Sequence, residues 1–376
     1  GITGLGSHRY AEGDPGFLGI VKNAQDIWNV SNPDHVNGGT NHFGSPFNFP
    51  EEFITVYRLH PLVPDLLDYR EWTAPHEIKR EVPVASMVRA DATPAMHDAG
   101  LANWALTMGE QRLGALTLQN HPAFLQNLPM PRIPGGSGKL DIPALDIIRD
   151  RERGIPRFNE FRRQYGLHSL SGFDDFIDAR LPADSPSRMH QEELVQKLRE
   201  VYGQHRCDDS KVITESQRLD GRPITDCLGH PDGSMVDNIE DLDVVVGWLA
   251  ESTRPHGFAI SETQFTVFII NASRRLFSDR FFTSSFRPEF YSTLGIEWVN
   301  NNGPDGKVME TVESNGHADE VSPLKRVLLR TMPELTEQLS GVVNAFDPWD
   351  RDRGAYYSLE WKPRPGAEAD PAFRQR

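Results

Sequence analysis

The sequence predicts a mostly α-helical protein with long connecting loops. Apolar residues recur at helical spacing in several segments, whereas alternating strand patterns are scarce. Glycine and proline supply 31 and 28 of the 376 residues, which is high for a helical protein and indicates long ordered loops between helices. A chain of this length is long enough for one large domain or two medium ones.

The composition argues against several classes of function. Lysine and arginine number 39 against 54 aspartates and glutamates, so the formal net charge is −15 at pH 7. A nucleic-acid-binding surface needs a basic patch, which an acidic chain does not favour. No apolar run reaches the roughly 18 residues of a membrane-spanning helix, and no signal peptide is visible at the N-terminus. These features slightly favour a cytoplasmic location and leave it otherwise open.

The chain is expected to fall into three parts. Residues 1–50 form a loop-rich segment that leads into the core, because glycine, proline, asparagine and histidine dominate them. Residues 51–346 form a helical core. Residues 347–376 are charged and proline-rich, as expected of a surface strap or tail. Within the core, the polar stretch 203–236 is expected to be inserted or mobile, and residues 207–227 within it are expected to form a loop.

The two cysteines, Cys207 and Cys227, bracket part of that polar stretch. They form neither a disulfide framework nor a zinc motif. Two interpretations stay open. They are two reduced thiols, or they form a single disulfide that closes the loop, which would require an oxidising compartment.

The first helix is expected to begin at Glu51, because two acidic residues in a first turn suit the positive end of the helix dipole. It is expected to continue to His60, where Pro61 limits it. Side chains at helical spacing then share one face: Phe53, Val56, Tyr57 and His60. On this face His60 is either a metal ligand or a buried core histidine, and Tyr57 is either functional or an ordinary core aromatic.

Further helices are expected along the rest of the core, in the ranges 98–128 (two helices broken near 120–122), 140–167 (two helices broken at 154–156), 173–202, 238–253, 261–282, 287–300 and 322–335. In the 140–167 pair most charges are typical of a solvated helix face. Asp146 is different, because it stands among apolar neighbours. A buried carboxylate needs a partner, so we expect Asp146 to point inward, together with Arg149, toward a group such as an imidazole N–H.

The segment 261–282 is the most apolar of the predicted helices, yet it carries Arg274 and Arg275 toward its end. Two guanidinium groups at the end of an apolar helix suit a long apolar ligand with an anionic end. Internal ion pairs with Asp279 or Glu262 are the competing explanation.

Four segments together carry a resemblance to a known superfamily, and they occur in its order: YRLHPLVPD, PALDIIRDRERGIPRFNEFRR, SRRLFSDRFFTSSFRPE and PLKRVLLRTMPEL. Over residues 45–350 the chain resembles the haem peroxidase and cyclooxygenase superfamily, the animal-type peroxidases. The Tyr-x-x-His and RDRERG forms look most like its fatty-acid dioxygenase branch, which includes the plant α-dioxygenases and bacterial relatives. The resemblance implies an animal haem-peroxidase-like helical fold and haem as cofactor.

The resemblance also implies roles for single residues. His60 matches the proximal ligand of the haem iron, and Tyr57 matches the tyrosine that becomes a radical in the oxygenase branch. Asp146 falls where many members have an asparagine that bonds the proximal imidazole, and a carboxylate there would make the imidazole more basic. Arg149 matches a contact to a haem propionate.

Arg274 or Arg275 falls near the arginine that anchors the substrate carboxylate in α-dioxygenases, and the resemblance does not choose between the two. The superfamily's distal histidine lies well over a hundred residues before the proximal one, but only 59 residues precede His60. We therefore expect the chain to match the C-terminal, proximal-haem portion of the catalytic domain. The distal half, with its usual calcium loop, would come from an N-terminal half or a separate chain.

Three functions follow as hypotheses. The first is a haem-dependent fatty-acid dioxygenase that uses peroxide and O₂, in which a Tyr57 radical abstracts hydrogen from a long-chain fatty acid. The second is a haem peroxidase that oxidises other small organic donors. The third is a haem-free or partner-dependent chain without catalysis of its own. The enzymatic hypotheses connect the protein to fatty-acid oxidation or to the response to oxidative stress.

Overall fold

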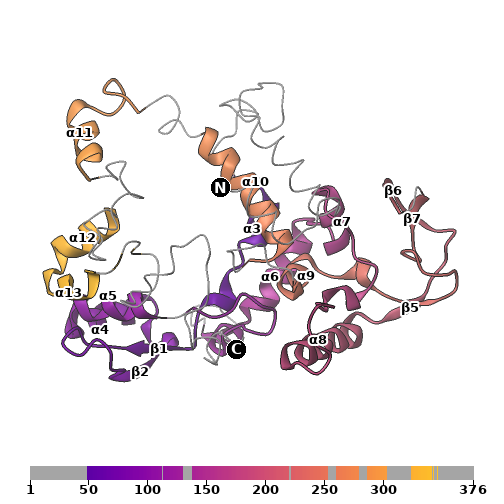
Figure 1. The fold of residues 1–376 in the computed structure, drawn as a ribbon, viewed down its shortest axis with the longest axis horizontal. Helices are drawn as coiled ribbons and strands as arrows, with labels where there is room; N and C mark the ends of the chain where they lie inside the picture. The colour runs from indigo at the N-terminus through magenta and orange to yellow at the C-terminus, as the bar shows by residue number, and fades with distance from the viewer. Residues whose placement is uncertain are drawn as a thin grey trace. The chain divides into compact units, whose positions relative to one another are not determined.

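The computed structural model describes residues 49–111, 113–129, 138–219, 222–252, 260–278, 286–302, 323–340, 342 and 345 (Figure 1). Most of the expected loop-rich segment 1–50 and the whole tail 347–376 lie outside these residues. The described chain is mostly helical, which confirms the predicted fold class.

The described helices, 3₁₀ turns and strand pairs have the following bounds in chain order. The α-helices are α3 (Glu51–Val56), α4 (Ala92–Ala99), α5 (Leu101–Glu110), α6 (Ile142–Glu152), α7 (Phe158–Gln164), α8 (Pro186–Tyr202), α9 (Val244–Ala250), α10 (Glu262–Ser278), α11 (Thr293–Asn302), α12 (Pro323–Thr331) and α13 (Thr336–Leu339). Short 3₁₀ turns are η2 (His60–Leu62), η3 (Val84–Met87), η4 (Arg89–Asp91), η5 (Ala123–Gln126), η6 (Phe173–Phe176), η7 (Ile239–Asp241) and η9 (Pro333–Leu335). Antiparallel strand pairs are β1 (Leu66–Tyr69) with β2 (Arg80–Pro83), β3 (Leu128–Pro129) with β4 (Lys139–Leu140), β5 (Gln204–Arg206) with β8 (Met235–Asp237), and β6 (Val212–Leu219) with β7 (Arg222–Thr225).

The chain divides into two compact units. The first unit takes its described residues from Gly1–Pro61, Leu116–His121 and Leu125–Thr283. Its centre is α9, which is buried along its whole length and contacts α3, α6, α7 and α10. A Cβ on Gly247 would lie only 2.2 Å from the Phe158 ring, so the close approach of α9 to α7 requires glycine.

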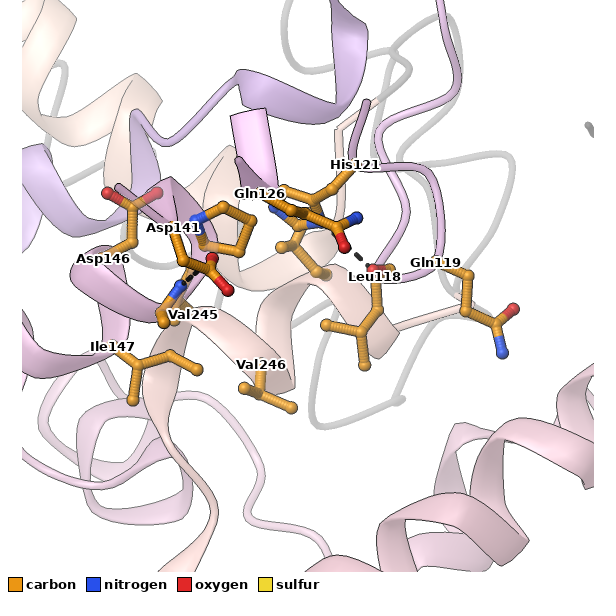
Figure 2. A pocket seen from close by; sticks show the side chains of 12 residues that line it. Leu118, Gln119, His121, Gln126, Asp141, Asp146, Ile147, Val245 and Val246 are labelled. Carbon is orange, nitrogen blue, oxygen red and sulfur yellow. Dashed lines mark hydrogen bonds between the residues drawn. The ribbon is translucent and has the colours of Figure 1, made fainter. Parts of the chain in front are cut away.

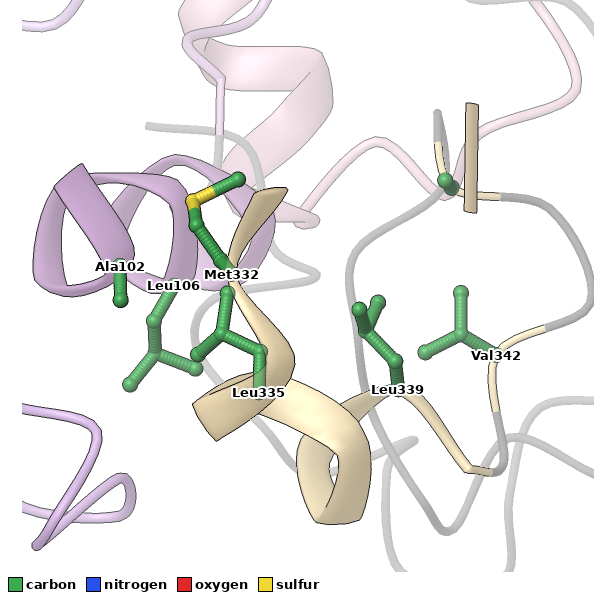
Figure 3. Close-up of a cluster of buried hydrophobic side chains, with 7 residues drawn as sticks. Ala102, Leu106, Met332, Leu335, Leu339 and Val342 are labelled. Atoms are coloured by element: carbon green, nitrogen blue, oxygen red, sulfur yellow. The ribbon is translucent and has the colours of Figure 1, made fainter. Parts of the chain in front are cut away.

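The second unit takes its described residues from Leu62–Ala115, Pro122–Phe124 and Ser284–Arg376. A buried apolar cluster joins α5 to the segment that ends the described chain (Figure 3); its members are Ala102, Leu106, Met332, Leu335, Leu339, Val342 and Ala345. The β1–β2 hairpin also packs on α5. Removal of this apolar surface from water is the main force that stabilises the unit.

The expectation that one helix runs from Glu51 to His60 is wrong. Helix α3 ends at Val56, Tyr57 occupies its C-cap, and His60 begins the separate turn η2. Pro61 explains the difference, because in a continuous α-helix its ring would clash with the carbonyl four residues earlier, at Tyr57, and it has no N–H to continue the hydrogen-bond ladder. Tyr57 and His60 are therefore not stacked on one helix face.

The first helix predicted within 98–128 is shorter than expected, because α5 ends at Glu110. The break near 120–122 is present, but only the 3₁₀ turn η5 follows it. Gly100, with a φ of 84°, separates α5 from the preceding α4. Glycine adopts this left-handed φ without the steric cost of a side chain. In contrast, the 140–167 pair is confirmed: α6 and α7 flank the expected break at 154–156.

The polar stretch 203–236 is not loop-like. It contains β5, the β6–β7 hairpin and the start of β8. The register of β6 against β7 shifts twice, between Val212 and Thr214 and between Thr214 and Arg218. Such irregularities break the alternation that would reveal a strand in the sequence. Cys207 and Cys227 form a buried disulfide, the second of the two interpretations.

Candidate functional site

The candidate site begins at the end of α3, where two side chains from other helices hold the chain. Trp248 of α9 donates its indole N–H to the Thr55 carbonyl at 3.2 Å. Gln264 of α10 donates its amide to the Val56 carbonyl at 2.7 Å. The last carbonyls of a helix have no partner within the helix, so these bonds satisfy them. They anchor the segment that carries His60.

His60 meets Asp146 across 86 positions of sequence. Its Nδ1 lies 2.8 Å from Asp146 Oδ2, inside the range of a normal hydrogen bond, and Asp146 is buried in α6. An ionised carboxylate only accepts, so this bond assigns the proton to Nδ1 and leaves the Nε2 lone pair available. Within the described chain Nε2 has no hydrogen-bond partner, and a third of the side chain is exposed. The structure therefore has the contact that the sequence predicted for Asp146.

A guanidinium completes this arrangement, and sequence reasoning missed it. Arg58 Nη1 lies 3.3 Å from Asp146 Oδ1, and Nη2 lies 3.6 Å from Asp150 Oδ1. The Thr55 hydroxyl donates to the other oxygen of Asp150. Burial raises the pKa of Asp150, while the bonds from Thr55 and Arg58 oppose that rise. The spacing of Asp146 and Asp150, four apart on one helix face, was a visible signal for such a pair.

Arg149 does not turn inward with Asp146, so that expectation is wrong. Its side chain is exposed and makes no hydrogen bond or ion pair within the described part of the chain. Asp146 and Asp150 share the face of α6 that points inward. At 3.6 residues per turn, Arg149 lies about 100° around the helix from Asp150 and so falls outside this buried face. Arg58 takes the place beside Asp146 that Arg149 was expected to fill.

Tyr57 is half exposed, at 54%, so it is not the core aromatic of the competing interpretation. Its ring stacks on Phe53 with centroids 5.2 Å apart, and Phe53 stacks in turn on Phe49 at 5.1 Å. Phe53 also lies 6.2 Å from Phe268 of α10. The aromatic row holds the Tyr57 ring in place while leaving it accessible to a reactant.

A cavity of about 460 Å³ reaches Asp146 from between α6 and α9 (Figure 2). Its lining is Leu118, Gln119, His121, Gln126, Asp141, Pro143, Ala144, Asp146, Ile147, Val245, Val246 and Leu249. Burial lowers the pKa of His121, whose Nδ1 lies 3.2 Å from the Leu118 carbonyl. A carbonyl can only accept, so Nδ1 of His121 carries a proton. Sequence reasoning missed this residue, which stands alone in a polar turn.

For the two arginines predicted to bind substrate, the structure describes the backbone but not the side chains. Arg274 and Arg275 lie in α10, but their side chains lie outside what the structure describes, as does Asp279. Glu262, the other competing partner, pairs with Arg162 at 2.8 Å.

That second ionic cluster, at Arg162, is closed. Arg162 also bonds Glu251 and donates to Thr263 at 2.8 Å and to the His168 carbonyl at 2.7 Å. Burial raises the pKa of Glu251, which also accepts two bonds from Thr263. The charged groups next to Glu251, those of Arg162 and Glu262, are buried and paired with each other. This cluster therefore stabilises the fold and is not a candidate reaction site.

Comparison with known proteins identifies the family of the chain. The profile of the animal haem peroxidase family matches residues 20–212 and 234–315. The chain belongs to the animal haem peroxidase family. The gap between the two matched stretches contains nearly all of the β6–β7 hairpin, together with Cys227.

Within this family the chain is similar to α-dioxygenases. It is 36% identical over 315 residues to the α-dioxygenase PIOX of Pisum sativum and 34% identical over 320 residues to α-dioxygenase 2 of Arabidopsis thaliana. These alignments cover 82% and 83% of this chain but 39% and 40% of the relatives. The chain thus spans about two fifths of the length of these relatives.

Solved structures give the same similarity. The Oryza sativa fatty acid α-dioxygenase aligns with a TM-score of 0.57 at 31% identity, over 82% of this chain and 41% of that one. The Arabidopsis thaliana enzyme aligns with a TM-score of 0.59 at 28% identity, over 92% and 44%. A tyrosine-to-phenylalanine variant of the rice enzyme was solved with palmitic acid. None of the helices in the described chain combines the length and apolar character that a bilayer crossing needs.

Proposed function

We propose that the complete protein is a haem-dependent fatty-acid dioxygenase and that this chain supplies the proximal side of its haem site. The observation that carries the proposal is the hydrogen bond between His60 and Asp146. His60 stands three positions after Tyr57, whose phenol is exposed. The similarity to α-dioxygenases supports the substrate class, and the family supports haem.

The residues around His60 fit haem. A proximal haem ligand is a single neutral imidazole whose second nitrogen donates to a hydrogen-bond acceptor. His60 offers an available Nε2, and its Nδ1–H donates a hydrogen bond to a buried carboxylate. The exposed guanidinium of Arg149, one turn after Asp146 on α6, would pair with a propionate. When bound, haem would supply the one-electron oxidant that peroxide generates.

Tyr57 would carry out the step at carbon. Loss of one electron and the phenolic proton converts the phenol to a phenoxyl radical. That radical takes a hydrogen atom from the acyl chain and becomes a phenol again. The carbon radical combines with O₂, and the resulting peroxyl radical recovers a hydrogen atom from Tyr57, which gives a hydroperoxide and restores the phenoxyl radical. The net reaction adds O₂ to one C–H bond.

Arg274 or Arg275 would hold the carboxylate of the fatty acid. A carboxylate bound to a guanidinium in a site shielded from water contributes about 1.5–3 kcal/mol. Replacing the correct arginine with glutamine should therefore raise KM for fatty acids about tenfold to a hundredfold and leave peroxide consumption unchanged. No change for either variant would remove these residues from the substrate site.

The test of the proposal uses the complete protein loaded with haem. His60→Ala should abolish stoichiometric haem binding, while His97→Ala, a change at an exposed histidine, should not. Tyr57→Phe should keep haem and peroxide consumption but lose fatty-acid oxygenation, because phenylalanine has no O–H to form the radical. Tyr291→Phe serves as the matched control.

The outcomes separate the hypotheses. Full haem with an unchanged Soret band in His60→Ala would overturn the ligand assignment. Full oxygenation in Tyr57→Phe, or no oxygenation by the unaltered protein, would favour a peroxidase of small donors. A complete protein that takes up no haem would favour the chain without catalysis.

A further inference from the structure

We propose that Arg58 is a positioning residue that shares the Asp146 carboxylate with His60 and thereby limits how strongly this carboxylate draws on the imidazole proton. Its haem readouts rest on the proposed function. Arg58 itself touches neither the metal position nor substrate in this assignment, and it acts only through Asp146.

The two partners of Asp146 occupy different oxygens. His60 Nδ1 lies 2.8 Å from Oδ2, and Arg58 Nη1 lies 3.3 Å from Oδ1. The Asp146 side chain is 5% exposed and that of Arg58 is 16% exposed, so water screens their interaction weakly. One buried carboxylate therefore divides its negative charge between a cation and an imidazole N–H.

The position of Arg58 is itself constrained. Its second terminal nitrogen lies 3.6 Å from Asp150, whose other oxygen accepts from Thr55. The Nε of Arg58 is buried without a hydrogen-bond partner in the described chain. A buried donor without a partner is costly, so the fold keeps this guanidinium at the site although it does not satisfy all its donors.

The expected effect of Arg58 on bound haem iron is to favour the reduced, ferrous state. A carboxylate that accepts from the distant nitrogen of a ligating imidazole makes the imidazole more basic and favours the oxidised metal. A guanidinium on the other carboxylate oxygen opposes that effect, because it draws electron density toward itself. Without Arg58, the imidazole should be a stronger donor and ferric haem should be favoured further.

The experiment measures the midpoint potential of the haem-loaded complete protein. Arg58→Met should favour ferric over ferrous haem about tenfold, which corresponds to a fall of 59 mV for a one-electron couple. Arg58→Lys keeps the positive charge and should restore most of the potential. Asp146→Asn should move the potential upward, since a neutral amide draws less on the imidazole proton.

A matched control variant and a double-mutant cycle test whether Arg58 acts through Asp146. Arg153→Gln removes another guanidinium that joins the same two segments, through Glu51, without contacting Asp146, so it should leave the potential unchanged. Arg58→Met should have less than half its effect in an Asp146→Asn background. Equal shifts in both backgrounds would mean that Arg58 acts as a distant charge, and would overturn the inference.

A second readout needs no haem. In the haem-free protein the Nδ1 proton resonance of His60 should move downfield in Arg58→Met, since a carboxylate released from the guanidinium is a better acceptor. An unmoved resonance, or an unmoved potential in a protein that binds haem through His60, would overturn this inference alone. Failure of the unaltered protein to bind haem would overturn the proposed function but leave the resonance to decide the role of Arg58.

Discussion

The two ionic clusters of the first unit, centred on Arg58 and on Arg162, contain similar groups but are built differently. At Arg162, every guanidinium nitrogen donates, and the contacts to Glu262, Thr263 and the His168 carbonyl are 2.7–2.8 Å long. At Arg58, the contacts to the carboxylates are 3.3 and 3.6 Å long and Nε has no partner in the described chain. The closed cluster stabilises the fold, whereas the cluster at Arg58 includes His60, whose Nε2 is left available for a ligand.

The largest expected effect comes from opening the closed cluster. Arg162→Met should lower the free energy of unfolding by about 3–5 kcal/mol, because it leaves Glu251 and Glu262 buried without their cation. Urea unfolding followed by circular dichroism measures this. The exposed Arg180 is the control, and Arg180→Gln should change stability by less than about 0.5 kcal/mol. If Arg162→Met changed the free energy of unfolding only slightly, the conclusion that the Arg162 cluster stabilises the fold more than the Arg58 cluster would be wrong.

The next effect concerns the ligand rather than the fold. Asp146→Ala should weaken haem binding about tenfold to a hundredfold, because the imidazole that we propose as the proximal ligand loses the acceptor that orients it. Haem transfer to a scavenging globin gives the dissociation rates. Glu152→Ala, at an exposed position of the same helix, should leave them unchanged. Equal haem retention in both variants would place Asp146 outside the haem site.

A smaller effect on folding is expected at the open cluster. Arg58→Met should lower the free energy of unfolding of the haem-free protein by about 1–3 kcal/mol, since its contacts are long and one donor is already unsatisfied. The urea experiment used for Arg162 provides the direct comparison. A loss as large as that of Arg162→Met would show that both clusters serve stability alike.

The smallest effect is a dependence on pH. Burial holds the pKa of Asp150 above its ordinary value, so its contribution to stability is full below the unfolded pKa of about 3.9 and declines as pH rises through the folded pKa. Asp150→Asn should therefore gain stability relative to the unaltered protein as pH increases from 4 to 7, as measured by urea unfolding.

Asp243 provides the opposite sign as a control. Burial alone would raise its pKa, but bonds from Arg151 and Tyr202 and the nearby charge of Arg157 lower it. Its contribution is present above the unfolded pKa and is lost as pH falls through the folded pKa. Asp243→Asn should thus be least stable, relative to the unaltered protein, at neutral pH. The same pH trend in both variants would contradict the assigned directions.

Much of the site was accessible from the sequence, because its signals are local or carried by motifs. Helical periodicity and the break at 154–156 predicted α6 and α7, and the apolar surroundings of Asp146 predicted its burial. The order of the four resemblance segments predicted the family that the profile match shows. The two helices and the burial of Asp146 depend on neighbours within a few turns of chain, where spacing alone carries the information.

The tertiary structure decided what depends on distant neighbours. Arg58, not Arg149, pairs with Asp146, because the inward face of α6 is chosen by its packing on α9 and on the end of α3. The residues that anchor Thr55 and Val56 lie 193 and 208 positions away, at Trp248 and Gln264. Because the register of β6 on β7 is irregular, the sequence of this hairpin lacks the alternation of apolar and polar residues that would predict strands. Such contacts are selected by the burial and pairing energy of the whole unit, which no local pattern encodes.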